Sequence, residues 1–167
     1  MKLFKISNII TLLVIIGVAV GAVYYLFPQY PRDKVLVYLL KNSHIEKVTR
    51  NVGMGNVNVD RAVEELVKGP TKAEIKSGYF TEIPKGTKVI GVDVEDGTAF
   101  VNFNSRLTNY GGGTTRVKGL IAQIVYTLTE FPEVKQVRIQ VNGSGEVALG
   151  SEGYEIDTPL SKKDSKF

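Results

Sequence analysis

Residues 87–103 read TKVIGVDVEDGTAFVNF, and this stretch decides the fold. Its first half, 87–94, alternates apolar and polar residues, which is the period of a half-buried strand. Asp96 and Gly97 are the pair that most often closes a two-residue hairpin, because both turn positions need a positive φ. The second half, 98–103, returns with its apolar residues on one face. The stretch therefore predicts an antiparallel hairpin with one buried face.

A similar pattern lies upstream of this hairpin. Residues 35–40 (VLVYLL) predict a strand buried on both faces, and 45–52 predict a returning strand after a turn at 42–43. Asn58 then precedes an apolar stripe at helical spacing, so we expect a helix with Asn58 as its N-cap. The stripe consists of Val59, Ala62, Val63, Leu66 and Val67.

A second helix is expected after the 87–103 hairpin. An apolar stripe at helical spacing runs over 117–128, and Thr114 or Thr115 can cap its start. A strand over 134–141 follows, and then a turn and a short strand at 146–149. The stripe consists of Val117, Leu120, Ile121, Ile124, Val125 and Leu128.

The element order is strand, strand, helix, a polar connection over 71–87, and then strand, strand, helix and two more strands. This recurrence suggests an internal ββα duplication. Sheet faces and helix stripes together predict an α+β fold, a two-layer sandwich of a mixed or antiparallel sheet with two packed helices. We expect a linker over 28–33, the folded domain over 34–160, and a flexible tail over 161–167.

The N-terminal segment is apolar on all sides. Residues 9–27 would form a helix of about 28 Å, close to the ~30 Å hydrocarbon core, so we expect one transmembrane anchor. Lys2 and Lys5 precede it, which predicts a cytoplasmic N-terminus over 1–8 and a C-terminal domain outside the cytoplasm. Two alternatives remain open, a signal peptide cleaved after Ala22 and a buried core helix.

Composition excludes several classes of protein. The chain has no cysteine, which excludes disulfides, thiolate metal sites, cysteine nucleophiles and lipoprotein acylation. Two of the 21 Lys and Arg residues precede the apolar segment, and the chain carries 17 Asp and Glu residues. The region beyond the anchor is therefore nearly neutral. No basic stripe stands out, so nucleic acid is not expected as a partner.

Candidate catalytic groups are few. His44 is the single histidine and falls in a turn without a nucleophile motif, which indicates a solvated residue rather than a general base. Asp93, Glu95 and Asp96 could bind a hard cation. The turn accounts for Asp96, however, and the polar face of a strand accounts for the other two. We therefore expect no enzyme activity, no cofactor and no metal.

A glycine-rich loop is the candidate contact site for a partner or ligand. Glycines directly before a helix can present backbone N–H groups to an anion. No Lys-Ser or Lys-Thr follows in the phosphate-loop pattern, and a loop-closing turn is the simpler reading. Arg116 would sit in the first helical turn, where it could pair with a carboxylate or an anionic ligand. The candidate residues are Tyr110, Gly111, Gly112, Gly113, Thr114 and Arg116.

Several motifs, in the same order, resemble the GerMN (GerM-like, spore germination) domain family. The helix motif AVEELVKGP at 62–70 is similar to the family's "ALEELLKGP" helix, and the segment VDVEDGTAFVNFN at 92–104 resembles its hairpin. The segment IVYTLTEFPEV at 124–134 matches its second helix. Further similar segments are EIPKGT at 82–87, residues 137–143 and TPL at 158–160. The chain departs from the family at Asn102 and Asn104, and it lacks the lipoprotein cysteine of many members.

The resemblance implies a role in sporulation or germination in the bacterial envelope, and it supplies no catalytic residues. Such domains are similar to the ring-building domains of membrane-spanning assemblies. We therefore expect a membrane-anchored, non-catalytic module whose partners are the membrane and either envelope proteins or a second copy of itself. The alternative is a module that binds, or hydrolyses, cell-wall material or a small anion.

Overall fold

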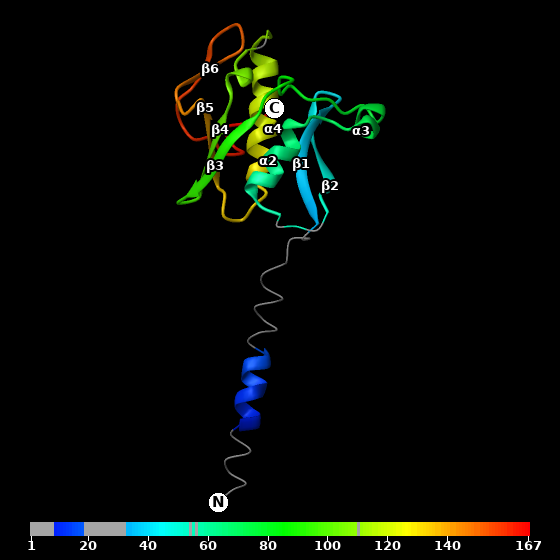
Figure 1. Cartoon of the computed structure of the whole chain (residues 1–167), viewed down its shortest axis with the longest axis vertical. Helices are drawn as coiled ribbons and strands as arrows, with labels where there is room; N and C mark the ends of the chain where they lie inside the picture. The colour runs from blue at the N-terminus through cyan, green and yellow to red at the C-terminus, as the bar shows by residue number, and fades with distance from the viewer. Residues whose placement is uncertain (1–8, 19–32, 54, 56, 110) are drawn as a thin grey trace, which may run out of the picture. The chain divides into compact units, whose positions relative to one another are not determined.

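The computed structural model describes residues 9–18, 33–53, 55, 57–109 and 111–167 (Figure 1). The chain divides into two units, Met1–Arg32 and Asp33–Phe167. In the first unit, residues 9–18 are helical with exposed side chains. Among the described residues, no helix combines the length and apolarity needed to cross a membrane. Residues 19–27 of the predicted anchor, and the cleavage position after Ala22, lie outside the described residues, so the anchor stays a prediction.

The second unit begins with the predicted hairpin. Strand β1 (Lys34–Lys41) pairs antiparallel with β2 (His44–Asn51), and Lys41 lies opposite His44. Asn42 and Ser43 form the turn with φ of 49° and 61°, in the left-handed region that tight hairpin turns require. Both strands were predicted, and both predictions are confirmed. The apolar side chains of β1 are almost fully buried: Val35, Val37, Leu39 and Leu40.

Helix α2 (Val59–Val67) starts where the sequence predicts. The Asn58 side chain accepts a hydrogen bond from the Arg61 backbone N–H at 2.9 Å, which caps the first turn. The connection over 71–87 is not wholly irregular as expected, because it contains the short helix α3 (Lys72–Lys76). Thr71 and Glu74 form a reciprocal capping box at its start.

Strands β3 (Val89–Glu95) and β4 (Thr98–Phe103) form the hairpin that the opening stretch predicts, with a bulge between Val89 and Gly91. A 3-10 turn, η1 (Ser105–Leu107), follows. Helix α4 (Thr114–Leu128) then carries the chain back, so that β5 (Gln136–Val141) pairs parallel with β4.

The expectation of a single sheet in a two-layer sandwich is wrong. The hairpin β1–β2 and the sheet β3-β4-β5 are separate, because no strand of one pairs with the other among the described residues. Helix α2 contacts β1 and β3, and α4 contacts β1 and β5, so the two helices lie between the sheets (Figure 1). The α+β class is confirmed. The ββα order does recur. Of its two occurrences, only the later one, β3, β4 and α4, is followed by a strand that pairs parallel with the sheet.

The C-terminal region packs onto the domain more than was expected. Strands β6 (Val147–Leu149) and β7 (Tyr154–Ile156) form a third small sheet, and β7 was not predicted. Residues 161–167 were expected to fray. Instead the Lys162 ammonium lies 2.8 Å from a Glu130 carboxylate oxygen, and Ser165 is buried. The folded unit therefore extends from Asp33 to Phe167 rather than over 34–160.

Candidate functional site

The described residues of the glycine-rich loop make their hydrogen bonds to other residues of the same domain. Gly113 is the N-cap of α4, so neither Thr114 nor Thr115 caps the helix as predicted. Thr114 donates from its backbone N–H and its hydroxyl to the Glu152 carboxylate, at 3.0 and 2.5 Å. A carboxylate at a helix N-terminus is favoured by the helix dipole. The chain's own Glu152 therefore occupies the position that an anionic ligand would take.

Arg116 is also engaged inside the domain. Its Nε donates to the Glu82 carboxylate at 2.7 Å, and its Nη1 donates to the Gly111 carbonyl at 2.8 Å. Sequence alone left two partners open for this guanidinium, a carboxylate and an anionic ligand. The structure assigns it to a carboxylate, which offsets a positive charge placed unfavourably in the first turn of α4.

Two positions near the start of α4 have room only for glycine, because side chains of α4 lie close to their backbone. A Cβ on Gly112, whose φ is +147°, would lie 2.7 Å from Arg116 Cδ. A Cβ on Gly150, whose φ is +70°, would lie 2.7 Å from Val117 Cγ2. Residues 111–116 thus join α4 to the turn before β7. Tyr110 lies outside the described residues, and partner contact through this loop stays a prediction.

Glu152→Ala is expected to lower the free energy of unfolding by about 1 kcal/mol, because Thr114 in the first turn of α4 loses the carboxylate that accepts its hydrogen bonds. Urea unfolding measures the change. Glu155→Ala is the matched control, since it removes an exposed carboxylate from β7 that caps no helix. Equal stability of the two variants would contradict the capping role.

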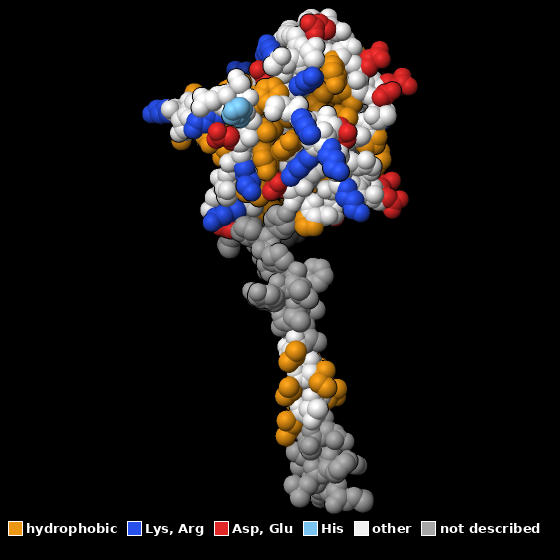
Figure 2. All heavy atoms as spheres, turned by 180° about the vertical axis from the view of Figure 1, so that it is seen from behind, with side chains coloured by type: hydrophobic (Ala, Val, Ile, Leu, Met, Phe, Trp, Pro, Cys, Tyr) orange, Lys and Arg blue, Asp and Glu red, His pale blue; other side chains and the backbone are white. Residues whose placement is uncertain are grey.

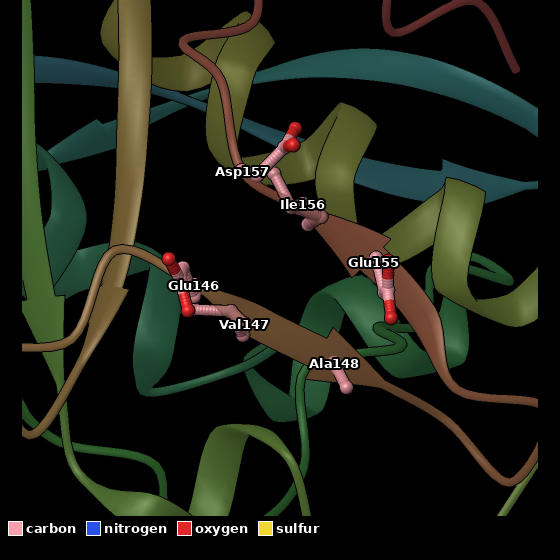
Figure 3. A pocket seen from close by; sticks show the side chains of 6 residues that line it. All are labelled: Glu146, Val147, Ala148, Glu155, Ile156 and Asp157. Carbon is pink, nitrogen blue, oxygen red and sulfur yellow. The ribbon is translucent and has the colours of Figure 1, made fainter.

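The remaining acidic candidates do not converge. Asp93, Glu95 and Asp96 are exposed on and beside β3. A hollow of about 280 Å³ beside β6 and β7 carries Glu146, Glu155 and Asp157, but their carboxylates point apart (Figure 3). Within the described residues, no group of three or more His, Asp and Glu side chains is arranged to hold a metal ion.

A cluster of Tyr38, Tyr126, Glu130 and Lys162 links β1, α4 and the C-terminal tail. The Tyr38 hydroxyl donates to Glu130 at 2.8 Å, and the Lys162 ammonium lies 5.8 and 5.5 Å from the Tyr38 and Tyr126 ring centroids. Burial, followed by the hydrogen bond to Glu130, raises the pKa of Tyr38. The cluster fastens the tail to the domain, and sequence reasoning missed it because its members are far apart in the chain.

Two buried polar side chains were also missed. Arg50 is 8% exposed, and its guanidinium donates to both Glu74 carboxylate oxygens at 3.0 and 2.7 Å. Gln123 is fully buried inside α4 and bonds to the Tyr38 carbonyl and the Glu82 N–H. Both look like ordinary surface residues in the sequence. Buried groups of this kind specify packing rather than chemistry, since their hydrogen bonds are satisfied within the domain.

One edge open to the addition of a further strand is that of β3. This strand pairs with β4 on one side and with no described strand on the other. Ile90 and Val94 are 56% and 39% exposed. Directly opposed residues share a face. Val94 therefore shares the inward face of Ala99, while Asp93 shares the outer face with Phe100. A strand added here would meet apolar side chains on one face and carboxylates on the other.

Comparisons with known proteins agree with the resemblance read from the motifs. The family model "Germane: Sporulation and spore germination" matches residues 23–146. The spore germination protein GerM of Bacillus subtilis (strain 168) is 30% identical over 134 residues, covering 75% of this chain and 35% of that protein. The chain thus spans about a third of that relative's length.

Solved structures match the folded domain. The first GerMN domain of the sporulation protein GerM from Bacillus subtilis has a TM-score of 0.65 at 26% identity, over 78% of this chain and 98% of that one. The tandem GerMN domains of the same protein give 0.60 at 27%, over 80% and 46%. A lipoprotein structure from Clostridium perfringens shares the fold at 18% identity, with a TM-score of 0.57 over 83% and 94%. By its sequence match and its motifs, the chain belongs to the Germane family of sporulation and spore germination domains.

Proposed function

We propose that this chain is a membrane-anchored assembly module of the bacterial envelope that acts by binding and not by catalysis. Residues 9–27 serve as the anchor, with the domain from Asp33 outside the cytoplasm. The apolar character of that segment and the two lysines before it support the topology. The role of the family in sporulation and spore germination supports a function in the envelope of a spore-forming bacterium.

The free edge of β3 is the observation that carries this proposal. An exposed strand edge is a template for strand addition, in which backbone hydrogen bonds supply affinity and alternating side chains supply specificity. Asp93 and Glu95 lie on the outer face of β3, and Asp96 follows in the turn. Pairing β3 with β3 of a second copy would place these carboxylates together. The edge therefore fits a strand of a different envelope protein in which apolar and basic residues alternate.

The alternative of small-anion binding at the glycine-rich loop is not favoured by the geometry. An anion at the start of α4 would have to displace Glu152 from Thr114, and one at Arg116 would have to displace Glu82. Both carboxylates belong to the same folded domain, so the loop is already neutralised.

A photo-crosslinking amino acid at Val94, introduced into the full chain in membranes of sporulating cells, is expected to capture one defined envelope protein. The same probe at Ile75, an exposed apolar residue on α3, is the matched control and should not capture it. Asp93→Lys/Glu95→Lys should abolish capture, because the edge would then repel a basic strand. Mass spectrometry identifies the partner and the crosslinked segment.

Capture that is equally strong from Ile75, or that survives charge reversal, would argue against the β3 edge. Capture of a second copy of this chain through β3 would replace the proposed partner with self-assembly. Membrane anchoring is tested in the same cells, since a variant lacking residues 9–27 should leave the membrane fraction.

A further inference from the structure

Strand β3 contains a glycine, Gly91, at a position where the domain itself does not require one. The φ of Gly91 is not positive, so neither a left-handed turn nor the type of bulge that needs a left-handed glycine accounts for it. A Cβ built on Gly91 would meet no atom within 4 Å, so close packing does not account for it either. Glycine inside a strand lowers its stability and often marks a place where a ligand or another backbone approaches closely.

Gly91 lies with Ile90 on the outer face of the sheet β3-β4-β5, the face turned away from the core. Val89 and Val92 flank this pair, and both pack against the core. The bulge places two residues instead of one between these inward-facing valines, so Ile90 and Gly91 both lie on the outer side. Both residues are exposed, in agreement with this placement.

The side chain opposite Gly91 on the neighbouring strand does not fill the space that the glycine leaves. Asn102 lies opposite Gly91 on β4. Its Oδ1 accepts a hydrogen bond from the Gly143 N–H at 2.9 Å, in the turn that follows β5. Because β5 lies on the other side of β4 from β3, this bond turns the Asn102 side chain away from Gly91. The space over Gly91 is therefore open, with the exposed Ile90 beside it.

The residues around this space define what can fill it. Asp93 and Glu95 follow Gly91 at alternate positions, so they share its face. Phe100 lies opposite Asp93 on β4 and is half-buried. Figure 2 shows Asp and Glu side chains along the margin of the folded domain where Figure 1 places β3 and β6. The space is thus bordered by apolar surface from Ile90 and Phe100 and by negative charge.

We propose that Gly91 determines which strand binds to the β3 edge, because it makes room for a bulky aromatic side chain of the partner. The ring of a Phe, Tyr or Trp opposite Gly91 lies across the position of the missing side chain, against Ile90 and toward Phe100. Two residues along the partner strand, a Lys or Arg side chain faces Asp93. This inference rests on the proposed strand addition at β3, and it adds the identity of the partner's side chains.

The test uses the photo-crosslinking probe at Val94 of the full chain, in membranes of sporulating cells. Gly91→Val should reduce capture of the partner about tenfold, because the valine side chain occupies the space of the ring. The melting temperature of the full chain in detergent should stay the same or rise, because valine favours a strand and its Cβ meets no other atom. A purely structural role of Gly91 predicts the opposite, a lower melting temperature. Gly91→Ala, the smaller change, should lose less capture.

Gly55→Val is the matched control for Gly91→Val. A Cβ on Gly55 also meets no atom within 4 Å, and Gly55 lies before α2 rather than on β3. Capture by this variant should equal capture by the chain that carries the probe alone. Full capture by Gly91→Val, or an equal loss in Gly55→Val, would overturn the role of Gly91 and leave strand addition at β3 intact. No capture by the chain with the probe alone would overturn the proposed function, and this inference with it.

The partner's aromatic residue gives an independent test. Mass spectrometry of the crosslinked peptide identifies the partner strand, and its aromatic residue is then replaced by Ala. This replacement should weaken capture by the chain with the probe alone, but it should not weaken capture by Gly91→Val further, because the contacts of the ring are already lost there. Additive losses would overturn the inference, because they would mean that the ring does not lie over Gly91. A captured strand without Phe, Tyr or Trp would overturn it directly.

Discussion

Replacing Arg50 with methionine is expected to lower the free energy of unfolding by about 3–5 kcal/mol, the cost of breaking a buried ion pair by removing one partner. The guanidinium holds Glu74 through two hydrogen bonds and also donates to the Gly69 carbonyl at 2.8 Å. Its loss leaves a carboxylate that is only 12% exposed without its cation. Urea unfolding followed by circular dichroism measures the change.

Matched variants isolate the buried pair. Arg61→Met removes a guanidinium that is 39% exposed on α2 and should cost less than about 1 kcal/mol, as for other surface ion pairs. Arg50→Met/Glu74→Leu should recover part of the loss, because no buried charge is then left unpaired. An Arg50→Met variant as stable as Arg61→Met would contradict this role of Arg50 in joining β2 to α2 and α3.

The same pair predicts a pH dependence. Desolvation, the largest single influence, raises the pKa of Glu74, but the hydrogen bonds from Arg50 and from Thr71 together hold it below its ordinary value of 4.5. The pair therefore stabilises the fold fully above that ordinary value. This stabilisation is lost as the pH falls through the lower pKa of the folded state. In Arg50→Met, the acid-induced loss of stability over this window should be smaller than in the wild type.

Gln123→Leu is expected to lower the free energy of unfolding by about 2–4 kcal/mol, although the side chain keeps nearly the same volume. The amide of Gln123 accepts from the Glu82 N–H at 2.8 Å and donates to the Tyr38 carbonyl at 3.1 Å. Leucine leaves both backbone groups unpaired in the interior, which is the costly way to lose a hydrogen bond.

The Glu82 amide gives this prediction a local readout. In Gln123→Leu its hydrogen exchange should become much faster under native conditions, because its acceptor is gone. Gln140→Leu is the control, since that side chain is half-buried on β5. It should cost less than about 0.5 kcal/mol, as expected for a substitution near the surface. Unchanged exchange at Glu82 would show that Gln123 does not hold the segment after α3.

Local patterns predicted the elements of the fold well. The turns at Asn42-Ser43, Asp96-Gly97 and Asn142-Gly143 all have positive φ, as their residue types indicate. The stripe of α4 is buried along its whole length. Even the missed helix α3 carried a readable signal, the Thr71 and Glu74 spacing of a capping box.

Relations between distant segments could not be predicted in this way. Division of the strands into three sheets depends on pairing partners that periodicity does not name. Glu152 caps a helix that begins 38 residues earlier. Its carboxylate therefore lies where the glycine-rich loop was expected to bind an anionic ligand. Arg50 follows the polar alternation of β2, and it bonds to α3 and to the end of α2, segments that the pattern of β2 does not name. The sequence therefore located the loop of interest but not its neighbours.

The contact between β1 and α4 has a consequence for synthesis of the chain. The Tyr38 N–H donates to the Thr127 hydroxyl, 89 residues later. At about 5–20 residues per second, the ribosome needs roughly 4–18 s to make that partner after Tyr38 has been added. During this interval α2 is the one described helix able to cover the apolar side chains of β1, because α4 has not yet been completed. The domain therefore folds only late in synthesis or after it, and until then the nascent chain stays open to chaperones and to any transport machinery that requires an unfolded substrate.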